Sequence, residues 1–401
     1  PDAPGVVGGS WLTQTWAMLV DAYRELNSRR LFWITLLLSL VVVVAFAFVG
    51  IDQDGITVFG VKFENAAWST RFIPPATFYK LLFTTVAIPW WLGVIASILA
   101  LVSLCGVFPE FISGGSIDLY LAKPIGRLRL FLTKYFTSLL FVALQVLVFS
   151  TASVLLIGLK SGSWEFGIFL AVPLVTLFFS YLFCVCVLLG LITRSALASL
   201  LLTVLFWLFL FSLNSTDAAL ALFKSTKEKQ VEDQRALVER NQKVIDANRQ
   251  LAPDRPEINS PWELQQQAAR QTLARFEEEA AQLRWWHGLF RAIKAPLPKT
   301  SETVDLMSRW LVEPEPMLRA REESARQEAR RRQERQRRRG AATTAATQRD
   351  RAEWNPDDPA VMQRVQAELG ARRAVTILGT SLAFEACVLG VAAWIFCRRD
   401  Y

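Results

Sequence analysis

Six stretches of the chain are long enough and apolar enough to cross a membrane, and they constrain the fold more than any other feature. They cover residues 31–49, 81–108, 137–159, 165–192, 196–213 and 374–396. A helix needs about 20 mostly apolar residues to cross the hydrocarbon core, because each residue adds only about 1.5 Å. Backbone groups in lipid must pair within their own segment, which favours helices. The sequence therefore predicts an all-α polytopic membrane protein with six transmembrane helices in the lipid bilayer.

The composition agrees with a membrane protein and offers little material for catalysis. Hydrophobic residues make up 52% of the chain, and they are clumped rather than spread. The five cysteines lie in or beside apolar runs, which argues against a disulfide framework. The single histidine, His287, cannot form a multi-histidine metal site, and no G-x-x-x-x-G-K-[ST] phosphate loop is present. We therefore expect no enzyme activity, no catalytic residues, no metal and no cofactor in this chain.

The positions of the cations predict the orientation of the six helices. Arg29 and Arg30 precede the first span and Arg398 and Arg399 follow the last, so both ends are expected in the cytoplasm. The predicted location is the cytoplasmic (inner) membrane. Residues 1–30 form the lead-in, which is either an amphipathic helix on the membrane surface or an ordinary lead-in helix. Residues 31–213 then contain spans one to five.

A charged region of another kind, residues 214–373, separates spans five and six, and residues 374–401 hold span six and a short tail. Residues 224–251 and 262–294 alternate charge over a helical pattern, and residues 319–339 are almost purely charged. Such segments are typical of a helical hairpin or coiled coil, so we expect a large helical/coiled-coil insertion. The span count places it outside the cytoplasm, since long loops are translocated largely regardless of charge. Nucleic acid is therefore not an expected partner of its arginine run.

Residues 110–136 are the only long polar segment between two apolar runs in the first half of the chain. Gly115 breaks any preceding helix, Asp118 lies on the polar side of a short amphipathic piece, and Pro124 ends that piece. Arg127 and Lys134 then alternate with large apolar residues, as in a helix that lies in the membrane interface. The segment is either a short cytoplasmic loop with anchoring cations or a docking element for a partner protein.

The second interpretation comes from a resemblance. The segment is similar to the cytoplasmic segment of ABC-2 type transporter permeases. The matching residues are Glu110, Gly115, Ser116, Ile117, Asp118, Pro124, Arg127 and Lys134. Ser116 stands where the family usually has threonine and Gly126 where it often has serine. Phe111 and Ile112 replace a charged pair.

The resemblance implies a permease subunit that exports an unknown substrate. It further implies a separate ATPase subunit, which would carry ATP and Mg²⁺, and a second permease copy in a homo- or heterodimer. The matching residues would couple this chain to the ATPase.

Glu385 is the one acidic residue well inside a predicted span, and Gln145 is a second polar residue at membrane depth. A lone intramembrane carboxyl is costly, so it is a candidate functional site by default. No lysine or arginine lies at matching depth in another predicted span, so we expect Glu385 to be protonated, or hydrogen-bonded to Gln145 or Ser381. Its role is either a structural hydrogen bond or a part in transport. Gln145 alone is more typical of contact between helices.

Two other functions remain open from the sequence. In the first, the chain is a non-transporting membrane scaffold that presents a long helical extracytoplasmic domain to a partner. In the second, it is a secondary transporter driven through Glu385, although its halves show no inverted repeat.

Overall fold

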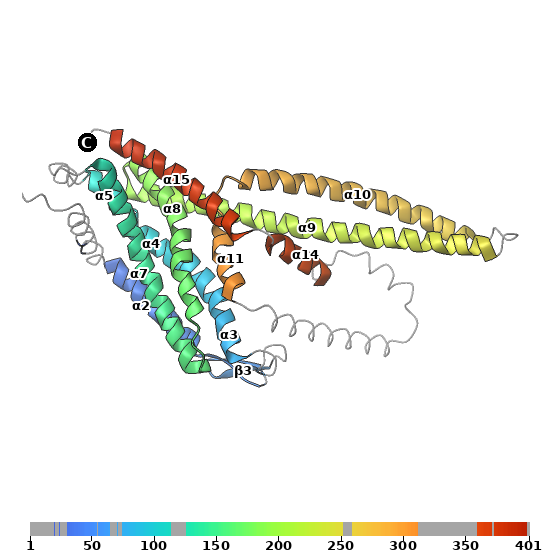
Figure 1. Cartoon of the computed structure of the whole chain (residues 1–401), viewed down its shortest axis with the longest axis horizontal. Coiled ribbons are helices and arrows are strands. Elements are labelled where there is room, and N and C mark those ends of the chain that lie inside the picture. Colours follow the sequence, from blue (N-terminus) through green and yellow to red (C-terminus); the bar gives the residue numbers. More distant parts are fainter. Residues whose placement is uncertain are drawn as a thin grey trace, which may run out of the picture. The chain divides into compact units, whose positions relative to one another are not determined.

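The computed structural model describes residues 20, 24, 30–53, 55–64, 70, 74–113, 126–251, 259–311, 359–370 and 373–398. The predicted lead-in helix and residues 319–339 fall almost wholly outside this part of the chain. Contacts divide the protein into two units. The bundle unit comprises Pro1–Phe209, Pro298–Arg332 and Ile377–Tyr401, and the hairpin unit comprises Leu210–Leu297 and Gln333–Thr376. Figure 1 labels the elements of both units.

Five helices are long and apolar enough to cross a membrane, which confirms the predicted membrane-helix character. They are Pro75–Ile112, Arg127–Ser161, Phe166–Thr193, Ala196–Leu251 and Ala374–Arg398. The first predicted span is shorter than expected, because helix α2 (Arg30–Ala47) ends two residues before strand β1 (Val49–Ile51) begins. Its apolar part, Phe32–Ala47, falls below the length of the other five. Within the described residues there are thus five candidate spans, and α2 is a shorter apolar helix.

The first of these five helices has a wide π-helical middle. It comprises α3 (Pro75–Leu82), the π-helix η1 (Phe83–Ala96), α4 (Ser97–Leu104) and α5 (Val107–Ser113). Pro89 lies inside η1, where its missing N–H disturbs the regular ladder of backbone hydrogen bonds. Side-chain hydroxyls compensate at both ends: Thr85 donates to the Leu81 carbonyl at 2.7 Å and Ser97 to the Leu92 carbonyl at 2.7 Å. The helix can therefore keep a proline at membrane depth.

Trp91 ties this π-helix to α2. Its indole Nε1–H donates to Ser39 Oγ at 3.0 Å, and both residues are buried. Tryptophans in membrane helices are enriched at the interface, where they act as anchors. That role fits exposed Trp90 only, because Trp91 points into the bundle unit.

We expect Ser39→Ala to destabilise the protein by about 1–3 kcal/mol, because it leaves the buried indole N–H without an acceptor. Thermal unfolding in detergent measures the effect. In a Trp91→Phe background the same change should be nearly neutral, since no donor remains. An equal loss in both backgrounds would contradict the hydrogen bond.

A small antiparallel sheet follows α2, in the order β1-β2-β3. Strands β2 (Gly55–Val58) and β3 (Val61–Glu64) pair Val58 with Val61 around a two-residue turn. Both turn residues have positive φ, 48° at Phe59 and 83° at Gly60, as tight hairpins require. Residues 55–64 therefore form a β-hairpin. Tyr79 Oη on α3 donates to the Val49 carbonyl at 3.1 Å and holds the sheet against that helix.

Helix α7 (Arg127–Ser161) corrects the expectation of a separate interfacial helix over residues 127–136. Those residues are the first turns of one continuous 35-residue helix, which begins after extended Gly126 and ends at Gly162, where φ is 69°. Beside it lie α2 and α8 (Ala171–Thr193), which follows the short 3-10 helix η2 (Phe166–Leu170) (Figure 1). The cations Arg127 and Lys134 are thus rigidly joined to the third predicted span.

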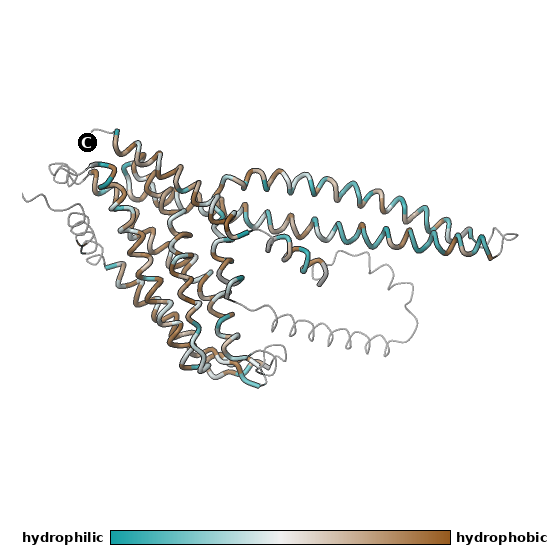
Figure 2. The backbone as a smooth tube through the Cα atoms, viewed as in Figure 1, coloured by the Kyte–Doolittle hydropathy of each residue, from teal (hydrophilic) through white to brown (hydrophobic). Residues whose placement is uncertain are grey.

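Helix α9 (Ala196–Leu251) is continuous for 56 residues and does not stop at the predicted end of span five, residue 213. Its hydropathy changes along its length, from apolar at the start to charged beyond residue 223 (Figure 2). Helix α10 (Ser260–Lys294) returns antiparallel to it within the hairpin unit. Three cross-helix ion pairs fix the register, Lys227–Glu279, Arg235–Glu277 and Arg249–Glu263.

Helix α11 (Thr300–Leu311) differs from the prediction of one domain over residues 214–373. It belongs to the bundle unit and packs on α8, η1 and η2. Val304 and Leu306 are buried there. The charged insertion therefore contributes one helix to the core of the bundle unit.

Candidate functional site: the buried carboxyl of Glu385

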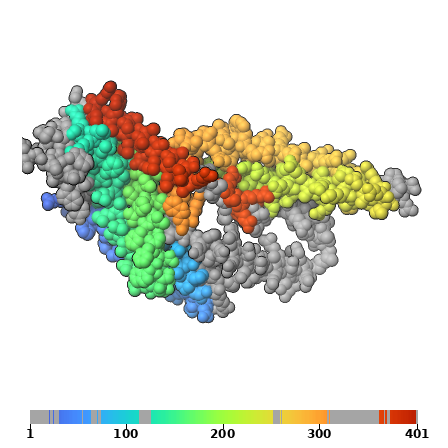
Figure 3. Space-filling model, viewed as in Figure 1, coloured from blue at the N-terminus to red at the C-terminus, as the bar shows by residue number. Residues whose placement is uncertain are grey.

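Glu385 lies midway along α15 (Ala374–Arg398) and is 8% exposed. Tyr135 Oη, on α7, donates to Glu385 Oε1 at 2.8 Å. Ser180 Oγ, on α8, lies 2.8 Å from Glu385 Oε2. Three helices thus meet at one carboxyl group, and the space-filling view shows α15 lying over α7 (Figure 3).

The partners of Glu385 correct the sequence-based expectation of Gln145 or Ser381. The helices α7 and α15 run antiparallel, with the rings of Phe131 and Phe396 5.6 Å apart. Their register brings Tyr135 to the carboxyl and leaves Gln145 ten residues further along α7, or about 15 Å away along its axis. Gln145 is buried, and its Nε2 has no hydrogen-bond partner among the described residues.

The hydroxyl of Ser180 allows the site to hold Glu385 in either protonation state. Ser180 Oγ also lies 2.8 Å from the Leu177 carbonyl. When Glu385 is ionised, the Ser180 hydroxyl can donate to Oε2. When Glu385 is protonated, its Oε2–H can donate to Ser180 Oγ while the serine donates to Leu177. One rotation of a hydroxyl group thus accommodates a proton without moving a heavy atom.

Aromatic rings close the site on the α8 side. The ring of Tyr135 stacks on Phe183 with centroids 5.4 Å apart, and Phe183 stacks on Phe179 at 5.6 Å. All three side chains are fully buried. Hydrogen bonds in such an apolar environment are strong when made and costly when lost.

A second polar group lies one helical turn from Glu385, around Ser381 on the same helix. The backbone N–H of Lys299 donates to Ser381 Oγ at 2.9 Å, and Lys299 Nζ donates to Thr380 Oγ1 at 3.0 Å. Lys299 is buried and immediately precedes α11. The expected absence of lysine and arginine concerned the other spans, and Lys299 lies in none of them. The sequence places Lys299 in the charged insertion, far from any apolar run.

The predicted coupling residues are only partly described. Gly115, Ser116, Asp118 and Pro124 lie outside the described residues, and Glu110 is exposed on α5. Among the others, Arg127 Nη1 donates to the Cys397 carbonyl at 3.3 Å, and Lys134 Nζ lies 4.2 Å from the centre of the Phe111 ring. The end of α5, the start of α7 and the end of α15 thus meet at one end of the bundle unit (Figure 1).

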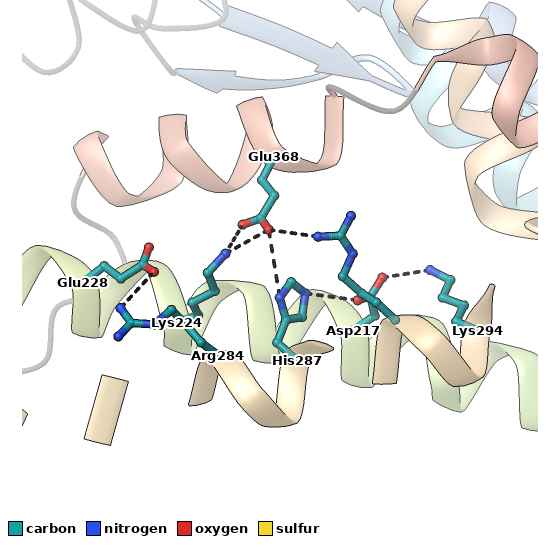
Figure 4. A network of polar contacts seen from close by, with 8 residues as sticks. Asp217, Lys224, Glu228, Arg284, His287, Lys294 and Glu368 are labelled. Carbon is teal, nitrogen blue, oxygen red and sulfur yellow. Dashed lines mark hydrogen bonds and ion pairs between the residues drawn. The ribbon is translucent and has the colours of Figure 1, made fainter. Parts of the chain in front are cut away.

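The hairpin unit holds the other large polar cluster (Figure 4). Asp217 on α9 is 3% exposed and pairs with Lys294 Nζ at 2.9 Å and His287 Nε2 at 3.3 Å. Glu368 on α14 (Pro359–Gly370) binds Lys224 Nζ at 3.0 Å and lies 3.9 Å from His287 Nδ1. His287, which offered no catalytic site from the sequence, is instead the link between α9, α10 and α14.

Ion pairs on the hairpin surface lower the pKa of several carboxyls, among them Glu232 and Glu279. A hydrogen bond from Arg364 lowers the pKa of Glu232 below its ordinary value of 4.5, and one from Lys227 does the same for Glu279. Both groups therefore stabilise the fold above that value, and the contribution disappears as the pH falls through the lowered pKa. Each effect is small because these side chains are largely exposed.

Within the described part of the chain, no three His, Cys, Asp or Glu side chains form a group that could hold a metal ion. No protein-family model matches the chain, and neither a curated protein nor a solved structure is detectably similar to it. Evidence about function therefore comes from the geometry and from the motif in residues 110–134.

Proposed function

We propose that the chain is the permease subunit of an ABC-2 type exporter, driven by a separate ATPase subunit. The observation that carries the proposal is the position of Glu110, Arg127 and Lys134, which flank residues 114–125 at one end of the bundle unit. The remaining motif residues lie in that interval. In this proposal all six apolar helices, α2 included, cross the cytoplasmic membrane, both chain ends lie in the cytoplasm, and two permease copies form the pathway.

Helix α7 would transmit the motion of the ATPase. The motif ends at Lys134, and the next residue is Tyr135, the hydrogen-bond donor to Glu385. A push on residues 110–134 would move the start of α7. The contact between α7, α8 and α15 at Glu385 would then move with it. Rigid helices transmit such displacements because packed interfaces do not deform continuously.

We expect Asp118→Ala to abolish transport while the protein still inserts in the membrane and retains its thermal stability. The matched variant Ser116→Thr introduces the residue that is usual in the family and should leave transport unchanged. Co-purification from the native membrane, followed by identification of the bound chains, tests the same proposal directly. Recovery of an ATPase with wild type that is lost with Asp118→Ala would support docking. Unchanged transport and ATPase recovery in this variant would overturn it.

The hairpin unit favours a second candidate, a non-transporting scaffold. A 56-residue helix with a charged antiparallel partner suits the presentation of a binding surface away from the membrane. The same purification discriminates the two functions. A stable protein recovered without any ATPase would favour the scaffold.

A further inference from the structure

The last turns of α10 carry an exposed apolar stripe made of Trp285, Trp286, Leu289 and Ile293. Their exposed fractions are 63%, 49%, 38% and 47%, respectively. At 100° per residue the four positions fall within an arc of about 100°. The two indole rings meet edge to face with centroids 4.9 Å apart. We call this surface the tryptophan stripe.

The tryptophan stripe points away from α9. His287 and Lys294, on the opposite arc of α10, are the residues that bind Asp217 of α9. Arg291, which lies 3.8 Å from Glu368 of α14, also falls outside the stripe. Among the described residues, the contacts that assemble the hairpin unit leave the stripe exposed, although burial of two tryptophans and two aliphatic side chains would be favourable.

The position of the tryptophan stripe along the axis of α9 indicates the environment in which the stripe lies. Lys294 pairs with Asp217, and Arg284 lies 3.8 Å from Glu228, so the stripe lies beside residues 217–228 of α9. Residues 196–223 of α9 contain a single charge, Asp217, and that charge is paired. From Lys224 onward the helix is highly charged. The stripe thus lies beside the point at which a candidate membrane helix changes from apolar to charged.

Tryptophan is enriched at this boundary in membrane proteins, because its ring is apolar and its N–H can face water or headgroups. We propose that the tryptophan stripe lies in the interfacial layer of the bilayer and anchors the base of the hairpin there. The partner is lipid, and the proposal does not depend on the transport function.

Photo-crosslinking of the full chain tests the contact. Benzoylphenylalanine is introduced at position 286 or, in a second variant, at 289. The protein is reconstituted into vesicles of phosphatidylcholine and phosphatidylglycerol, irradiated and digested. Position 264 is the matched control, because Leu264 is 72% exposed on the same helix. It lies 22 residues away, or about 33 Å along the axis.

Mass spectrometry should find roughly tenfold more lipid adduct at 286 and 289 than at 264, because only the stripe reaches the interfacial layer. Equal adduct yields at the three positions would overturn the proposal. Crosslinks from 286 and 289 to a second copy of the chain, in place of lipid, would overturn it as well. That result would make the stripe a contact between protein subunits.

Discussion

Glu385→Ala is expected to destabilise the bundle unit by about 2–4 kcal/mol. The carboxyl accepts a hydrogen bond from the Tyr135 hydroxyl and pairs with Ser180, so its removal takes away two buried hydrogen bonds and opens a cavity among three helices. Thermal unfolding in detergent or nanodiscs measures the loss. Cys387→Ala is the matched control, because Cys387 lies two residues away on α15 and is exposed. Equal melting temperatures for the two variants would show that Glu385 does not hold the helices together.

A double-mutant cycle assigns the loss to the proposed partner. Tyr135→Phe alone removes one donor, and its effect should shrink in the Glu385→Ala background, where the carboxyl acceptor is absent. Additive effects would mean that the Tyr135 hydroxyl and Glu385 stabilise the protein independently.

Glu385→Gln separates a structural role from a part in transport. Glutamine keeps the size of the side chain and one carbonyl acceptor for Tyr135, but it can neither ionise nor carry a proton. Because both carboxyl oxygens contact neighbouring helices, we expect a structural role and transport close to that of wild type. A transport defect in a variant that folds and melts normally would instead assign the carboxyl to the transport step.

Hydropathy alone predicts the apolar helices, because these depend on composition. It fails where the end of a helix depends on contacts with neighbouring elements. Spans two to six are recognisable because each holds about 20 apolar residues. The end of α2 cannot be recognised from hydropathy, because Val49 is as apolar in strand β1 as it would be in a helix. The length of α9 was accessible in principle: no glycine or proline occurs between Ala196 and Leu251. A change from apolar to charged residues ends a membrane span without ending a helix.

From the sequence, the candidate site could be predicted only as the single residue Glu385 and not as a set of contacting residues. Glu385 stands out as a carboxyl within an apolar stretch, but its partners are set by the antiparallel register of α7 and α15, which has no local signal. Nothing in the sequence around Tyr135 and Ser180 distinguishes them from the other polar residues of the apolar helices. Lys299 was hidden for another reason, since the short amphipathic helix that follows it, α11, is too polar to resemble a membrane element.

In the hairpin unit, Asp217→Ala is expected to have the largest effect, about 3–5 kcal/mol. Lys294 and His287 are both buried against this carboxylate, and its loss removes the buried ion pair between Asp217 and Lys294. A loss of 3 kcal/mol corresponds to roughly a hundredfold faster opening of the base of the hairpin. Hydrogen exchange of the peptides that cover residues 214–224 and 284–294 measures that opening in the full chain.

The control for this prediction is another ion pair on the same helix. Glu239 binds Lys243 at 2.7 Å, but both side chains are exposed, so Glu239→Ala should leave exchange at the base unchanged. Asp217→Asn tests the charge alone, because it keeps the shape of the side chain and removes only its negative charge. If it accelerates exchange nearly as much as Asp217→Ala, the charge of Asp217 holds α10 against α9. If the asparagine variant exchanges like wild type, packing rather than the ion pair closes the hairpin, and the prediction for Asp217 is wrong.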